Sequence, residues 1–108
     1  MAQIANDANF DQIVGQDETP VLVDFWAPWC KPCHALSPIL DETEAAGTFR
    51  FRLVKVNADE NAEVAQRFNV RSLPTLVLMS KGETLGRKIG SMSRSALEQW
   101  MSASLPAG

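Results

Sequence analysis

The apolar positions of the chain fall into short continuous runs separated by segments with helical spacing. Three runs are rich in β-branched and aromatic side chains, a composition that predicts strands at residues 21–26, 51–57 and 75–79. Only Asp24 interrupts the first run, which predicts a strand covered on both faces. A more polar stretch at 84–89 follows the turn pair Lys81-Gly82 and predicts an edge strand that forms a hairpin with the third run.

Apolar residues at helical spacing predict four helices, at about residues 10–14, 34–46, 61–68 and from residue 94 onward. We expect Asn6 or Asp7 to cap the first helix, because their side chains can accept backbone N–H bonds. Gly47 is expected to end the second helix, and Ser93 to cap the last. The alternation of strands and helices predicts a sheet with helices on both faces.

Length and charge limit the classes of function. The chain has 108 residues, which fits one domain spanning 1–108. The net charge of -3 is spread along the sequence without a basic stripe, so we expect neither a nucleic-acid nor a membrane partner. The N-terminal sequence MAQIANDANFDQ lacks the pattern of an export signal, and no apolar stretch approaches roughly 18 residues. We therefore expect a cytoplasmic protein.

The two cysteines, Cys30 and Cys33, lie where the first predicted strand gives way to the next helix. In a reducing compartment this spacing indicates metal binding or redox chemistry. The first turn of a helix presents unpaired N–H groups and the positive end of the helix dipole, and both stabilise a thiolate at Cys30. Pro32 fits that turn, because its missing N–H would have no intrahelical partner. We predict an exposed Cys30 thiolate that attacks a substrate disulfide, and a more buried Cys33 that resolves the mixed disulfide.

Two other interpretations of the cysteine pair are weaker. A closed zinc site needs about four ligands, whereas the chain offers two cysteines and the single His34, so we expect no bound metal. We expect His34 to be a solvated helix residue. The second interpretation makes both cysteines small core residues, but it leaves the Trp and Pro residues that flank them unexplained.

Four separated motifs follow one another along the chain. They are Trp26-Ala27-Pro28-Trp29-Cys30-Lys31-Pro32-Cys33, then Val54-Lys55-Val56-Asn57, Arg71-Ser72-Leu73-Pro74-Thr75 and Lys88-Ile89-Gly90. In order and spacing they resemble the thioredoxin family over nearly the whole chain. The resemblance implies an α/β thioredoxin fold, with a central five-stranded mixed β-sheet flanked by four helices. It also implies a monomer that reduces protein disulfides without a bound cofactor and is itself reduced by an NADPH-dependent thioredoxin reductase.

The resemblance implies roles for polar residues near the cysteines. Asp24 is expected to accept the proton of Cys33, directly or through water, with Lys55 as its charged neighbour. Burial within an apolar strand should raise the pKa of the Asp24 carboxyl group, because a buried charge is unfavourable. The alternative is a structural ion pair between Asp24 and Lys55, which would oppose that rise.

The resemblance also implies a shallow apolar surface beside the cysteines that accepts an extended stretch of substrate backbone. Its residues would be Trp29, Leu73, Gly90 and a cis Pro74, with Trp26 in a supporting role. For Trp29 the alternative is a partly exposed packing residue.

Lys31 stands where the family most often has glycine. In water, a lysine charge about 6 Å from the sulfur stabilises the thiolate by about 0.7 kcal/mol, which raises the redox potential by about 15 mV. Two alternatives remain open for the function. One is a thioredoxin-fold disulfide oxidase or isomerase whose redox potential is more oxidising because of Lys31. The other is a non-catalytic interaction module whose thiols take no part in its function.

Overall fold

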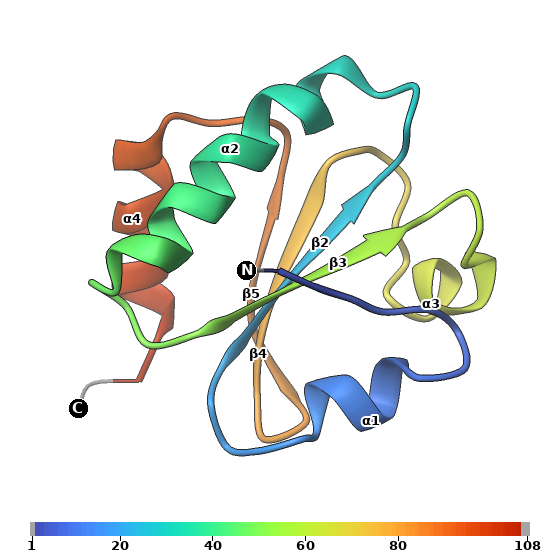
Figure 1. The fold of residues 1–108 in the computed structure, drawn as a ribbon, viewed down its shortest axis with the longest axis horizontal. Coiled ribbons are helices and arrows are strands. Elements are labelled where there is room, and N and C mark those ends of the chain that lie inside the picture. Colours follow the sequence, from blue (N-terminus) through green and yellow to red (C-terminus); the bar gives the residue numbers. More distant parts are fainter. Residues whose placement is uncertain (1, 107–108) are drawn as a thin grey trace.

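The computed structural model describes residues 2–106 of the chain. Within this range the elements are β1 (Gln3–Ile4), α1 (Phe10–Val14), β2 (Val21–Trp26), α2 (Lys31–Ala46), β3 (Arg52–Asn57), α3 (Ala62–Arg67), β4 (Thr75–Ser80), β5 (Glu83–Ile89) and α4 (Arg94–Ser104) (Figure 1). The strands and helices predicted from the hydrophobic pattern are all present. The helix after the cysteines begins earlier than predicted, at Lys31.

The strands form one sheet in the order β1-β3-β2-β4-β5. β3 runs parallel to both β1 and β2, whereas β4 is antiparallel to β2 and to β5, so the sheet is mixed. This confirms the thioredoxin fold that the resemblance implies, and it places β5 at an edge as predicted. The hydrophobic pattern did not predict β1, a strand of two residues that pairs only with β3.

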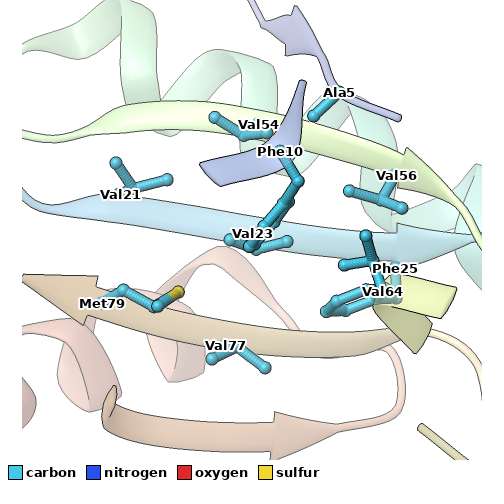
Figure 2. Close-up of a cluster of buried hydrophobic side chains, with 10 residues drawn as sticks. All are labelled: Ala5, Phe10, Val21, Val23, Phe25, Val54, Val56, Val64, Val77 and Met79. Atoms are coloured by element: carbon cyan, nitrogen blue, oxygen red, sulfur yellow. The ribbon is translucent and has the colours of Figure 1, made fainter. Parts of the chain in front are cut away.

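Two hydrophobic clusters occupy the two faces of the sheet. The cluster that joins the strands to α1 and α3 is shown in Figure 2: Ala5, Phe10, Val21, Val23, Phe25, Val54, Val56, Val64, Val77 and Met79. The other cluster joins the strands to α2 and α4: Leu22, Leu36, Leu40, Phe51, Leu53, Leu76, Leu78, Leu97 and Met101. Figure 1 shows the same two layers of helices. Because side chains alternate along a strand, Asp24 lies on the same face of β2 as Leu22, the face covered by α2.

Helix caps agree with the sequence at Gly47 and Ser93 and differ at the start of α1. Gly47 ends α2 in the left-handed conformation, with φ of 70°, and the hydroxyl of Ser93 accepts a bond from the Ala96 N–H at the start of α4. The N-cap residue of α1 is Asn9 and not Asn6, although the side chain of Asn6 accepts bonds from two backbone N–H groups in the turn that precedes α1. The prediction for Asp7 was wrong, because its carboxylate instead accepts the N–H of Val64 at 2.9 Å and so caps α3.

Candidate active site

Cys30 and Cys33 lie between the end of β2 and the first turn of α2, where they form a disulfide with a Cα–Cα distance of 5.3 Å. Cys30 is the N-cap residue of α2, and its sulfur accepts a hydrogen bond from the backbone N–H of Cys33 at 3.2 Å. Pro32 lies in the first helical turn, as predicted. The helix therefore directs an otherwise unpaired N–H group at the sulfur of Cys30.

The predicted contrast in exposure between the two cysteines is absent from this disulfide form. Cys30 and Cys33 are each 3% exposed. Ala27 is fully buried beside them, and the partly buried side chains of Trp26 and Leu73 pack against the three residues. The prediction of an exposed Cys30 was wrong for this form because the neighbouring loops enclose both cysteines. The two sulfurs differ instead in their bonding, since Cys30 carries the helix cap.

Asp24 is a buried carboxyl group in the middle of β2. It is 2% exposed, and its Oδ1 atom has no hydrogen-bond partner. Burial raises the pKa of Asp24 from 3.8 to about 7, against the opposing effect of the Lys55 charge, and the charge of Asp41 adds to the rise. The carboxyl group is therefore able to bind and release a proton near neutral pH.

Lys55 lies directly opposite Asp24 in the pairing of β2 with β3. Its ammonium group, however, donates to the Ser37 hydroxyl at 2.6 Å and lies 3.4 Å from a carboxylate oxygen of Asp41. Within residues 2–106, no ion pair joins Asp24 to Lys55 at 4.0 Å or less, so the predicted alternative of a structural pair is not formed. A cavity of about 200 Å³ is lined by Asp24, Trp26, Cys33, His34, Ser37 and Lys55.

The loop before β4 contributes the remaining predicted residues near the cysteines. The Leu73–Pro74 peptide bond is cis, as the resemblance implies. The N–H of Gly90, at the end of β5, donates to the carbonyl of Pro74 at 2.9 Å. Gly90 has a φ of 94°, a conformation that L side chains rarely adopt. The structure thus brings Leu73, Pro74 and Gly90 together beside the cysteine pair.

Trp29 and Lys31 flank the cysteine pair on the exposed side. Trp29 is 67% exposed, and its indole N–H donates to Asp59 at 2.7 Å. Lys31 is exposed at the start of α2. His34 is exposed, as predicted, but its ring also contacts the carbonyl of Pro28 at 2.7 Å.

Sequence reasoning missed three residues of this region, namely Ser37, Asp41 and Asp59. Ser37 and Asp41 were hidden among the polar positions of a helix, although their spacing of four residues places them on one helix face. Asp59 contacts a residue 30 positions away, and no local pattern indicates such a contact.

Among residues 2–106, no three His, Cys, Asp or Glu side chains are grouped so that they could hold a metal ion. Over the same range, no helix has both the length and the apolar character needed to cross a membrane.

Comparisons with known proteins agree with this geometry. The chain matches the thioredoxin family model over residues 1–103. It is 38% identical to thioredoxin from Haemophilus influenzae over 96 residues, which cover 89% of this chain and 90% of that protein. It is 38% identical to thioredoxin from Rickettsia felis over 105 residues, covering 97% of this chain and 100% of that protein. With thioredoxin from Pyropia yezoensis the identity is 43% over 91 residues, covering 84% of this chain and 85% of that protein. The chain therefore belongs to the thioredoxin family.

Proposed function

We propose that Cys30 is the attacking nucleophile and Cys33 the resolving thiol of this disulfide oxidoreductase. In the dithiol form, the Cys30 thiolate attacks one sulfur of a substrate disulfide, and the other substrate sulfur leaves as a thiolate that takes up a proton. Cys33 then loses its proton and attacks the Cys30 sulfur. The second substrate sulfur leaves as a thiolate and is protonated in turn, and the Cys30–Cys33 disulfide forms. Two electrons thus pass from the protein to its substrate.

The main support for these two roles is the hydrogen bond from the Cys33 N–H to the Cys30 sulfur. The bond is 3.2 Å long, and it comes from the first turn of α2, where the helix dipole also favours negative charge. A thiolate at Cys30 gains both stabilising effects. Cys33 lies inside the helix and has no equivalent bond to its own sulfur among the described residues.

We propose that Asp24 accepts the proton that the Cys33 thiol loses. Asp24 and Cys33 line the same cavity, which at about 200 Å³ has room for water between polar groups. With a pKa of about 7, Asp24 is partly ionised at neutral pH and so is matched to accepting a proton there. Lys55 lines the same cavity and lowers the pKa of Asp24 by its charge.

We further propose that substrates bind over Trp29, Leu73, Pro74 and Gly90. The exposed indole of Trp29 supplies apolar surface, and the loop of Leu73 and Pro74 lies against the cysteine pair. Such a surface suits an extended segment of many different sequences. Around this surface, Lys31 and Pro32 shape the start of α2, and Trp26 packs against the cysteines in support.

The proposed function also includes a compartment, an oligomeric state and an electron donor. The protein acts in the cytoplasm as a monomer formed by one domain, residues 1–108, and carries electrons from an NADPH-dependent thioredoxin reductase to protein disulfides. The relatives described above are named thioredoxins, which favours a reductant over an oxidase or isomerase.

Trapping of the mixed disulfide tests the two cysteine roles. The Cys33→Ser variant should accumulate a covalent complex with a disulfide substrate, because it can attack but cannot resolve. A Cys30→Ser variant is the matched control and should form no such complex. Mass spectrometry before and after added dithiothreitol measures both. Absence of the complex in the Cys33→Ser variant, or its formation in the Cys30→Ser variant, would contradict the assignment. If the protein were instead a non-catalytic interaction module, the Cys30→Ser variant would keep its function.

A further inference from the structure

The side chain of Lys55 is held by α2 and not by Asp24, its neighbour across the sheet. Its ammonium group lies 2.6 Å from the Ser37 hydroxyl and 3.4 Å from a carboxylate oxygen of Asp41. Ser37 and Asp41 are four residues apart on α2, so both lie on the helix face that meets β3. Both of these contacts join the ammonium group to α2, and neither joins it to Asp24.

Ser37 is the closer and better shielded of the two partners. The Asp41 side chain is 51% exposed, and ion pairs at such exposure contribute little, whereas the Lys55 side chain is only 18% exposed. The hydrogen bond to Ser37 is short and partly buried. It is consequently the contact that fixes the position of the Lys55 ammonium group.

Asp24 has one oxygen available for a new bond. Its Oδ1 atom is buried and has no hydrogen-bond partner, and the carboxyl group lines the same cavity as Lys55 and Ser37. A lysine ammonium group has three N–H donors, and losing a buried acceptor is unfavourable unless another replaces it. Asp24 Oδ1 is the acceptor in this cavity that lacks a partner.

We propose that Ser37 is a positioning residue for the proton transfer at Asp24: its hydroxyl holds the Lys55 ammonium group on α2 and so withholds an ionic partner from Asp24. The inference rests on the proposed role of Asp24 as the proton acceptor. A carboxyl group without a direct ionic partner keeps its affinity for a proton near neutral pH, whereas an ion-paired carboxylate loses it. Ser37 thereby determines the pH range in which Asp24 can work.

The charged and titratable groups around Asp24 come from two elements. β3 contributes Lys55, and α2 contributes His34, Asp41 and, in the dithiol form, Cys33. On β4, the residue opposite Asp24 is Leu76, which does not titrate. In the disulfide form Cys33 does not titrate either. The pKa of Asp24 is therefore best measured in the disulfide form, by site-resolved carbon NMR that separates it from His34 and Asp41.

The Ser37→Ala variant tests the proposal. Without the hydroxyl, the Lys55 ammonium group should turn to Asp24, and an opposite charge in contact should lower the pKa of Asp24 by about one unit. The Ser37→Thr variant keeps a hydroxyl at this position, so its Asp24 should have the same pKa as in the natural chain. Ser95→Ala, at an exposed serine of α4, is the matched control and should change nothing. An unchanged or raised pKa of Asp24 in the Ser37→Ala variant would overturn the proposal.

The same substitution in a chain without the Lys55 ammonium group shows whether Ser37 acts on the pKa of Asp24 through Lys55. In a Lys55→Met chain the group that Ser37 positions is gone, so adding Ser37→Ala should leave the pKa of Asp24 unaltered. An equal fall in both backgrounds would overturn the proposal, because Ser37 would then act on Asp24 by some other route.

The pH dependence of disulfide reduction separates this inference from the proposed function. If both hold, the acid limb of the rate profile moves to lower pH in the Ser37→Ala variant, by the same amount as the pKa of Asp24. If the pKa falls but the acid limb stays in place, Asp24 is not the proton acceptor and the link from Ser37 to catalysis is overturned. If the pKa itself does not move, the positioning role fails, whatever the profile shows.

Discussion

Replacing Asp24 by asparagine removes a charge that burial makes unfavourable. The carboxyl group is 2% exposed and its Oδ1 atom has no partner, so the ionised form is poorly solvated in the folded chain. The Asp24→Asn change keeps the shape of the side chain and abolishes its ionisation. We expect the variant to be more stable than the natural chain at high pH, and the advantage to shrink in acid.

The pKa of Asp24 sets both the sign and the size of this effect. The folded-state value of about 7 lies above the ordinary value of 3.8, so the folded chain holds the proton more tightly than the unfolded chain. The contribution of the protonated Asp24 to the free energy of unfolding is therefore complete below pH 3.8 and is lost as pH rises through about 7. At about 1.4 kcal/mol per pH unit, the loss across this window amounts to about 4 kcal/mol.

Urea unfolding of the disulfide form at pH 4 and pH 9 measures the difference. The free energy of unfolding of the Asp24→Asn variant, minus that of the natural chain, should be about 4 kcal/mol larger at pH 9 than at pH 4. Comparing two pH values cancels the packing difference between an amide and a carboxylic acid. Glu42→Gln makes the same kind of change at an exposed position of α2 and is the matched control. A relative stability that is the same at both pH values would show that burial does not raise the pKa of Asp24.

Two further predictions concern Lys31 and Asp7. Lys31→Gly should make the redox potential about 15 mV more negative, because it removes a charge that favours the thiolate; equilibration with glutathione measures this, and a change of opposite sign would contradict it. Asp7→Ala should lower the free energy of unfolding by about 1 kcal/mol, because Asp7 caps α3 through the Val64 N–H. Amide exchange at Val64 should quicken, and unchanged protection there would show that the cap is unimportant.

Much of the fold could be predicted because its central strands are short apolar runs. β2 and β4 are buried at nearly every position, and their sequences are apolar except at Asp24 in β2 and at the two ends of β4, Thr75 and Ser80. β1 carries no such pattern, because Ile4 is 80% exposed and the strand is defined only by its pairing with β3. The cap formed by Asp7 was misassigned for a similar reason, since its partner is 57 residues away.

The candidate site could be predicted as far as its chemistry is local in sequence. The placement of Cys30 at a helix start follows from the strand before it and Pro32 after it. The partner of Lys55 could not be predicted, because Asp24, Ser37 and Asp41 all lie near it and only the folded geometry selects among them. The burial of Cys30 likewise depends on loops that the tertiary fold brings together.

The equilibrium between dithiol and disulfide in glutathione buffers tests most directly whether this chain is a reductant. The fluorescence of Trp26 and Trp29, which lie beside the cysteines in sequence, can follow the equilibrium. We predict a redox potential below the cytosolic glutathione poise of roughly -220 to -260 mV, so that electrons flow from this protein to substrate disulfides. A potential of about -180 mV or higher would contradict the account and would indicate a disulfide isomerase or oxidase.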